Sequence, residues 1–139
     1  MKFLVIDDEQ PIRETLEMFL REKGYEVVCS EDGESGLEAV RSERPHVVIL
    51  DIRLPRMSGL EVLKKIKAME RDIRVIMITA YHDMGTAIQV INLGAFEYLQ
   101  KPIDLEAFEI IIKKVVINRQ VNNQLERMDR EGFPEQKTS

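Results

Sequence analysis

The sequence has 139 residues, and its 44% hydrophobic content is enough for one compact domain with a real core and a modest extension. A formal net charge of −5, with no basic stripe, argues against sequence-independent binding to nucleic acid, and no apolar run has the length of a signal peptide or a membrane span. The single cysteine, Cys29, excludes an intrachain disulfide, and its place in an apolar run favours a buried small side chain over a nucleophile. We therefore expect a cytoplasmic protein that makes no direct contact with nucleic acid or membrane.

The first third of the chain predicts two strands joined by a helix. Residues 2–6 form a short apolar run, typical of a buried parallel strand. Pro11 suits the first turn of a helix, and the apolar residues that follow recur on one face until Gly24. Residues 25–29 predict the second strand, and Asp32-Gly33 predicts a turn before a short second helix.

The middle of the chain repeats the same alternation. Residues 46–50 predict a third strand, and the loop after it contains Pro55, which disfavours helical geometry in the preceding residue. Ser58 and Glu61 have the spacing of a capping box, so a third helix should begin there. Residues 73–78 predict the fourth strand.

The last part of the chain ends on a helix that is longer than a compact domain needs. A fourth helix over residues 84–93 should stop at Gly94, and residues 96–99 predict a fifth strand. Asp104 then suits the start of the final helix. Beyond residue 118 its apolar positions thin to a broken coiled-coil spacing, which fits either a solvated helix end or a dimerising or interdomain linker helix.

Five acidic, hydroxyl or ammonium side chains stand at the carboxyl ends of the predicted strands. They are Asp7, Asp8, Asp51, Thr79 and Lys101. Alternation of strand and helix demands a parallel sheet with right-handed crossovers and helices on both faces, and ligands bind at the edge where the carboxyl ends of such strands meet. Singly, each of these residues would suit a helix cap, a strand end or a solvated charge. Together they predict one site in an α/β domain.

The chemistry of this site follows from its ligand types. Adjacent carboxylates repel each other unless a cation joins them, so Asp7, Asp8 and Asp51 predict a site for Mg²⁺ or Mn²⁺. The carboxylate of Asp51 can attack a phosphoryl group to form an acyl phosphate. Lys101 can reach that phosphate, and the hydroxyl of Thr79 can donate to one of its oxygens.

Four motifs of the sequence resemble those of the response-regulator receiver domains of two-component signalling. They are Val5-Ile6-Asp7-Asp8-Glu9, Ile49-Leu50-Asp51-Ile52-Arg53-Leu54-Pro55-Arg56-Met57-Ser58-Gly59, Ile78-Thr79-Ala80 and Gly94-Ala95-Phe96-Glu97-Tyr98-Leu99-Gln100-Lys101-Pro102. The resemblance implies a flavodoxin-like (βα)5 doubly wound fold with a five-stranded parallel sheet in the order 2-1-3-4-5, an extended C-terminal helix and a cis bond before Pro102. It also implies a receiver domain at residues 1–118, a helical extension at 119–130 and, from composition, a disordered tail at 131–139.

The resemblance also assigns roles to individual residues. Asp51 is the expected phosphoacceptor, and Asp8 and Asp51 would bind Mg²⁺ directly, with Asp7 acting through water and Arg53 through its main-chain carbonyl. Thr79 and Tyr98 match the switch pair, in which the hydroxyl turns toward the phosphate and the ring follows it. Ordinary core packing with a solvated hydroxyl is the alternative for Tyr98.

The partners and the output follow from the same resemblance. The phosphoryl group would come from a histidine kinase or a phosphotransfer protein, and the phosphorylated domain would change conformation and assist its own phosphorylation and dephosphorylation. The motif around Thr79 is most similar to receivers of enhancer-binding transcription activators, so we expect a C-terminal output domain in the full-length protein and a role in transcription. A homodimer through the fourth helix, the fifth helix and the extension is a further expectation.

Two other functions compete with this interpretation. One is a receiver-like dimerisation module that does not depend on phosphorylation, and the intact acidic set speaks against it. The other is a small phosphohydrolase with Asp51 as nucleophile, but such enzymes place a second Asp two residues on, where this sequence has Arg53. Arg53 and Tyr81 are instead expected to tune the access of water to the phosphoryl group.

Overall fold

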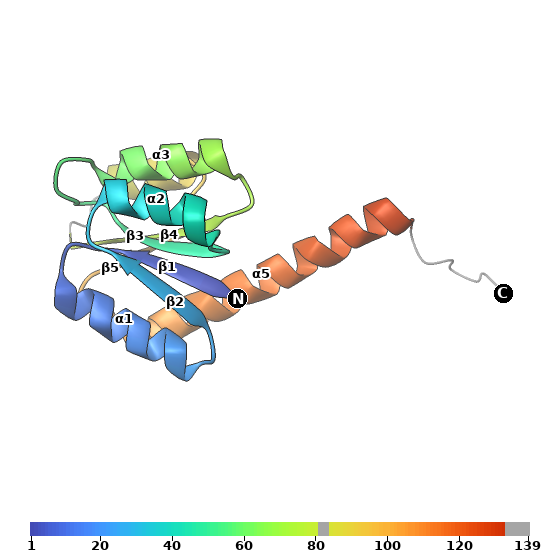
Figure 1. Ribbon diagram of the computed structural model, residues 1–139, viewed down its shortest axis with the longest axis horizontal. Coiled ribbons are helices and arrows are strands. Elements are labelled where there is room, and N and C mark those ends of the chain that lie inside the picture. Colours follow the sequence, from blue (N-terminus) through green and yellow to red (C-terminus); the bar gives the residue numbers. More distant parts are fainter. Residues whose placement is uncertain (81–83, 133–139) are drawn as a thin grey trace. The chain divides into compact units, whose positions relative to one another are not determined.

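The computed structural model describes residues 1–80 and 84–132, in which five strands alternate with five helices (Figure 1). The strands are β1 (Lys2–Ile6), β2 (Glu26–Ser30), β3 (Val47–Asp51), β4 (Arg74–Thr79) and β5 (Glu97–Gln100). The helices are α1 (Gln10–Glu22), α2 (Gly33–Glu43), α3 (Gly59–Met69), α4 (Met84–Asn92) and α5 (Leu105–Glu131). The chain divides into two units: residues 1–104 hold the sheet and α1 to α4, and the second unit, from residue 105 on, holds α5.

The sheet confirms the predicted fold class. All its strand pairs are parallel, and the strand order is β2-β1-β3-β4-β5. The register pairs Asp51 with Ile78 and Thr79 with Gln100, so the ends of the three strands from β3 to β5 lie level. Because the ends are level, polar residues at or just after these strands meet at one edge.

Apolar side chains on both faces of the sheet hold the first unit together. Figure 1 places α2 and α3 on one face and α1 on the other. Side chains from β1, β3 and β4 form one buried cluster with Leu37 of α2, Leu63 of α3 and Val90 of α4. Alternate residues of the same strands, such as Phe3 and Ile49, are also buried, as expected for parallel strands covered on both faces.

Four of the five strands begin and end one residue later than the sequence predicts. The predicted ranges were 25–29, 46–50, 73–78 and 96–99, whereas β1 agrees with the predicted range 2–6. The prediction placed the end of each strand at the last apolar residue. The ladder is made by backbone groups, so it also includes the polar residue that follows: Ser30, Asp51, Thr79 or Gln100.

Capping side chains fix the starts of α2 and α3. Ser58 caps α3, since its Oγ accepts a hydrogen bond from the amide of Glu61 at 3.4 Å. Asp32 and Gly33, predicted as a turn, are instead the N-cap and first residue of α2, with Asp32 Oδ1 accepting from the Ser35 amide at 2.8 Å. The predicted fourth helix begins at Met84 as expected and ends one residue early, at Asn92.

Helix α5 is continuous over 27 residues. Its buried residues are Phe108, Ile111, Ile112 and Val115, whereas Ile117, Val121 and Leu125 in the distal half are exposed. Glu131 is still helical, although the disordered tail was predicted to start there, and residues 133–139 lie outside the described part of the chain. The predicted domain limits at 118 and 130 stay predictions.

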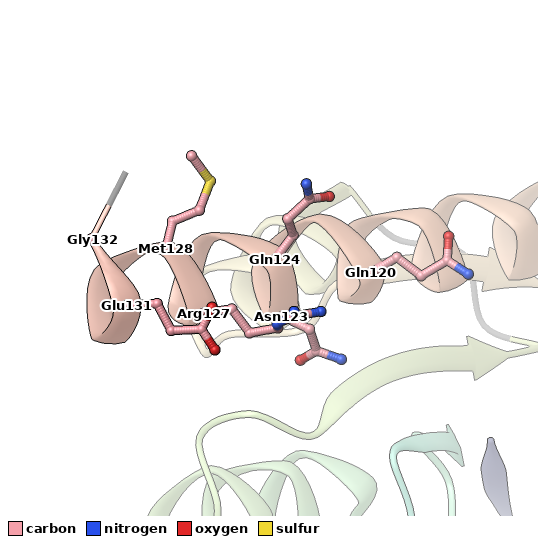
Figure 2. Close-up of a pocket in the computed structure, with 7 residues that line it drawn as sticks. All are labelled: Gln120, Asn123, Gln124, Arg127, Met128, Glu131 and Gly132. Carbon is pink, nitrogen blue, oxygen red and sulfur yellow. The ribbon is translucent and has the colours of Figure 1, made fainter. Parts of the chain in front are cut away.

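The distal part of α5 carries a shallow groove. The residues that line it are Gln120, Asn123, Gln124, Arg127, Met128, Glu131 and Gly132 (Figure 2). They all belong to one helix and the residue after it, so the groove is an open surface and not an enclosed cavity. Across residues 1–80 and 84–132, no helix is both long enough and apolar enough to cross a membrane.

Gly59 sets the distance between α3 and the end of β3. Its amide donates to the carbonyl of Ile52 at 2.7 Å, and a Cβ at this position would lie 2.1 Å from the carbonyl oxygen of Asp51 and 2.6 Å from the Cα of Ile52. Neither backbone atom can move without displacing the strand end. Only glycine therefore fits here without a shift of the residue that ends β3.

We predict that Gly59→Ala lowers the free energy of unfolding by about 1–3 kcal/mol, the usual range for overpacking. Gly36→Ala is the matched comparison, because its Cβ would meet the Cδ1 tip of the Ile6 side chain at 2.5 Å, and a side chain can turn aside where backbone cannot. Urea denaturation should rank the variants as parent, Gly36→Ala, Gly59→Ala in falling stability. Equal stability of the two variants would contradict this account of Gly59.

Candidate functional site

The side chain of Asp51 is buried and held at both of its oxygens. Asp51 is the last residue of β3 and is 3% exposed. Its Oδ1 accepts a hydrogen bond from the amide of Arg53 at 3.1 Å, and its Oδ2 accepts one from Nζ of Lys101 at 2.9 Å. The carboxylate is thus fixed in orientation by the turn that follows its own strand and by a cation from the far end of β5.

Asp7 lies directly after β1 and is completely buried. Its Oδ1 accepts from the amide of Glu9 at 2.8 Å, and its main-chain carbonyl accepts from Nη1 of Arg13 at 2.7 Å. Its Oδ2 forms an ion pair with Nζ of Lys101 at 2.9 Å, but this contact does not have the geometry of a hydrogen bond. Among the residues that the structure describes, this buried oxygen therefore accepts no hydrogen bond. Such an oxygen has an open coordination position.

Lys101 joins the carboxylates of the site. Its main-chain amide donates to the carbonyl of Thr79 at 2.7 Å, which fixes the residue beside the end of β4. Its ammonium lies 2.9 Å from Asp7, 2.9 Å from Asp51 and 2.6 Å from Glu9, while its side chain is only 8% exposed. The bond between Lys101 and Pro102 is cis, as the resemblance implied.

Glu9 is a residue of the site that the sequence reasoning missed. In the sequence it appeared only as the last residue of the first motif; in the structure it is the N-cap of α1, but its side chain makes no capping hydrogen bond. Its carboxylate instead makes the shortest of the three contacts of Lys101. The available signal was the run of three acidic residues after β1, Asp7 to Glu9, facing one predicted cation.

Burial and charge act in opposite directions on the ionisable groups of the site. Burial raises the pKa of both Asp7 and Asp51, and the negative charge of Asp7 raises that of Asp51 further, while the contacts of Lys101 oppose both shifts. Burial alone would lower the pKa of Lys101, but the carboxylates of Glu9, Asp7 and Asp51 together raise it. The lysine therefore stays charged, and the two aspartates carry unfavourable negative charge.

The residues present fit a hard divalent cation. Asp7, Asp8 and Asp51 each offer one carboxylate oxygen, and these oxygens lie within 4.8 Å of one another. Oxygens around an octahedral Mg²⁺ ion lie about 3 to 4 Å apart, so small side-chain rotations suffice. Asp8 is exposed, which leaves one side of the group open to water, and the Oδ2 of Asp7 offers an acceptor for an ion or for a water molecule bound to it.

Of the remaining predicted site residues, the structure describes Thr79, Tyr98 and Arg53. Thr79 is fully buried at the end of β4, next to the main chain of Lys101. Tyr98 on β5 is half-buried and packs against the apolar cluster of the first unit, an arrangement that fits both core packing and a switch role. Arg53 is exposed, and Tyr81 lies outside the described residues.

Cys29 differs from its prediction in exposure but not in chemistry. It is only partly buried, and its thiol donates to Oε2 of Glu17 at 3.2 Å. Burial, together with the neighbouring Glu17, raises the pKa of the thiol to about 12. A thiol with this pKa is almost entirely protonated at neutral pH, so Cys29 is a poor nucleophile, as expected.

Comparison with known proteins gives a consistent picture. A family model described as the response regulator receiver domain matches residues 3–113. The chain is 34% identical to the regulatory protein AtoC of Escherichia coli; the match covers 83% of this chain and 25% of AtoC. It is 35% identical to sporulation initiation phosphotransferase F of Bacillus subtilis; this match covers 81% of this chain and 91% of that protein. A receiver domain structure from Methanospirillum hungatei superposes with a TM-score of 0.83 at 27% identity, covering 87% of this chain and 97% of the other.

We predict that Asp7→Asn stabilises the metal-free protein at pH 7 but weakens Mg²⁺ binding about tenfold or more. The folded-state pKa of Asp7 is raised even with the contact of Lys101 included, so its charge opposes folding above that pKa. The contribution of Asp7 to stability is present below its ordinary pKa of 3.8 and is lost as the pH rises through the raised value. Asparagine removes this pH-dependent loss.

Thermal unfolding with and without Mg²⁺ measures both effects. The melting temperature of the parent should rise when Mg²⁺ is added. Asp7→Asn should have a higher melting temperature than the parent without Mg²⁺ and a smaller rise with it. Asp72→Asn, at an exposed position in the loop before β4, is the control and should leave both values unchanged. A metal-free Asp7→Asn protein that is less stable than the parent at pH 7 would show that the charge of Asp7 supports the fold.

Proposed function

Because the chain belongs to the response regulator receiver domain family, we propose that it is a phosphoacceptor signalling domain whose Asp51 receives a phosphoryl group from a histidine kinase or phosphotransfer protein. The observation that carries this proposal is the position of Asp51: a buried carboxylate held 2.9 Å from the ammonium of Lys101, with the carboxylates of Asp7 and Asp8 close by. An ordinary surface carboxylate has none of these constraints.

The proposed reaction is a direct transfer between two side chains. A carboxylate oxygen of Asp51 attacks the phosphorus of the donor phosphohistidine, a P–O bond forms as the P–N bond breaks, and the imidazole leaves with the electron pair of that bond and takes up a proton. Lys101 exchanges a carboxylate contact for a phosphoryl oxygen and so balances the charge on the product. The family implies Mg²⁺, which would supply charge neutralisation between Asp51 and the anionic phosphoryl group.

The residues proposed to hold the ion are Asp8 and Asp51 directly, Asp7 through water and Arg53 through its main-chain carbonyl. The donor set supports this assignment, since three carboxylate oxygens lie together and one buried oxygen of Asp7 lacks a directed hydrogen bond. Mn²⁺ prefers the same oxygen ligands and is the expected substitute.

The phosphorylated form is proposed to differ in conformation through Thr79 and Tyr98. Thr79 is buried beside Lys101, where its hydroxyl can turn toward a phosphoryl group, and Tyr98 is half-buried on the neighbouring strand. New contacts to the phosphoryl group would favour one of two arrangements of these side chains. The domain would thereby control an output and would assist its own dephosphorylation.

The output is proposed to be transcription, exerted in the cytoplasm through a C-terminal domain. The DNA-binding transcriptional regulator NtrC of Escherichia coli supports the proposal, since this chain is 37% identical to it over 86% of its own length and 26% of NtrC. The match to sporulation initiation phosphotransferase F, which covers 91% of that protein, supports a role in phosphoryl transfer but does not indicate which output is controlled. The phosphohydrolase alternative is weaker, because the side chain two residues after Asp51 is the base Arg53 and not an acid.

We predict that the protein incorporates one phosphoryl group from acetyl phosphate in the presence of Mg²⁺, detected as a mass increase of the intact chain. Chelation of the metal should reduce the rate at least about 100-fold, because the anionic donor then meets unneutralised carboxylates. Asp51→Asn should abolish the modification, while Asp72→Asn, an equal charge change at an exposed site, should retain it. Labelling of Asp51→Asn at the parental rate would remove the basis of the assignment.

A second proposed property, dimerisation through α4 and α5, rests on exposed apolar side chains. Met84, Ile88 and Ile91 of α4 are 73%, 57% and 47% exposed. In the distal half of α5, Ile117, Val121 and Leu125 are spaced four residues apart on one helix face and are 58%, 50% and 52% exposed. Burial of such stripes against a second copy of the chain is favourable at about 25 cal/mol per Å².

We predict a concentration-dependent dimer that Val121→Asp weakens at least about tenfold, because the stripe would then bury a charge. Sedimentation equilibrium provides the measurement. Met18→Asp is the control, since Met18 is 64% exposed on α1 and lies on neither surface. Comparison of the modified and unmodified chain tests the rival function: equal dimerisation of both would favour a module independent of phosphorylation.

A further inference from the structure

A cleft of about 260 Å³ opens beside the metal and phosphoryl site. The residues that line it are Asp8, Glu31, Asp32, Pro55 and Arg56. Asp8 is also the exposed member of the three carboxylates that can hold a metal ion. A small molecule in this cleft would therefore touch the open side of the site, where a phosphodonor has to arrive.

Among the described residues that line this cleft, Arg56 is the one cation. Its backbone φ of 67° lies in the left-handed region, which glycine adopts freely and residues with a Cβ adopt at a cost. Glycine would be the favourable residue by conformation alone.

The contact that Arg56 makes is an ion pair with Asp32. Its Nη2 lies 2.9 Å from Asp32 Oδ2, and the Arg56 side chain remains 69% exposed. The other oxygen of Asp32 caps α2 through the Ser35 amide, so the carboxylate is fixed in place. A guanidinium has five N–H donors, and this hydrogen bond uses one of them in the part of the chain that the structure describes.

We propose that Arg56 recruits the anionic phosphodonor to Asp51 by exchanging its ion pair with Asp32 for the phosphoryl oxygens of the donor. This inference rests on the proposed function. The carboxylates of Asp8, Glu31 and Asp32 repel an approaching phosphate, and Arg56 is the charge in the cleft that opposes this repulsion. A guanidinium binds phosphate oxygens in pairs, which suits this position better than the point charge of a lysine. Arg56 takes no part in the bond changes themselves.

Two substitutions distinguish recruitment of the phosphodonor by Arg56 from a purely structural role of its ion pair with Asp32. Arg56→Gln removes the cation, and Asp32→Asn frees it while keeping a side chain that caps α2 well. Both break the same ion pair, so a structural role predicts that they act in the same direction. Recruitment predicts opposite effects: a slower reaction for Arg56→Gln and a faster one for Asp32→Asn.

The measurement is the second-order rate constant of phosphorylation by acetyl phosphate at saturating Mg²⁺ and several salt concentrations. In this reaction the P–O bond to the acetyl group breaks, acetate leaves, and the P–O bond to Asp51 forms. We expect Arg56→Gln to lower the rate constant about threefold or more and to flatten its salt dependence, because one attractive charge is lost. The rate at saturating donor should change little.

Two further variants serve as controls. Arg56→Gly removes the charge and also relieves the left-handed conformation, so it should lose rate without losing stability. Arg41→Gln makes the same charge change in an exposed ion pair of the last turn of α2, the end opposite the Asp32 cap, and should match the parent. Parental rates for Arg56→Gln and Arg56→Gly, or a slower reaction for Asp32→Asn, would overturn the inference. An unlabelled parent would overturn the proposed function itself, and the inference with it.

Discussion

The interaction on which the site depends is the contact of one buried ammonium with three carboxylates. Asp7 and Asp51 are almost inaccessible to water, and negative charge at such positions opposes folding unless a cation compensates it. Lys101 provides part of that compensation at 2.9 Å from each, and Glu9 holds the lysine from the solvent side. One ammonium offsets only part of the charge of three carboxylates, so a divalent ion would add to this compensation and a phosphoryl group would redistribute the contacts of Lys101.

The backbone of the sheet makes this contact possible. Parallel pairing from β3 to β5 keeps the strand ends level, and the amide of Lys101 is fixed by the carbonyl of Thr79. Gly59 lets α3 approach the end of β3 so closely that no Cβ fits between them. Elements separated by 50 residues along the chain thus place Asp51 and Lys101 within hydrogen-bond distance.

Much of this arrangement could be predicted from the sequence, because apolar runs locate buried strands and polar residues at their ends share one edge. Asp7, Asp8, Asp51 and Lys101 were found in this way. The predicted limits of four strands lay one residue before the observed ones. Apolar side chains indicate which residues are buried, whereas the hydrogen bonds of the sheet are made by backbone groups. The contact of Glu9 with Lys101 spans 92 residues and depends on side-chain direction, which periodicity does not encode. The ion pair of Arg56 with Asp32 joins two loops and was missed for the same reason.

Helix α5 has a mechanical consequence that its sequence alone would not suggest. Its 27 residues form an uninterrupted rod about 40 Å long at 1.5 Å per residue. A tilt of about 10° at its first turn would displace its last turn by about 7 Å, several times the shift needed to repack a side chain. Over this length a continuous helix converts a small angular change at one end into a displacement of several ångströms at the other.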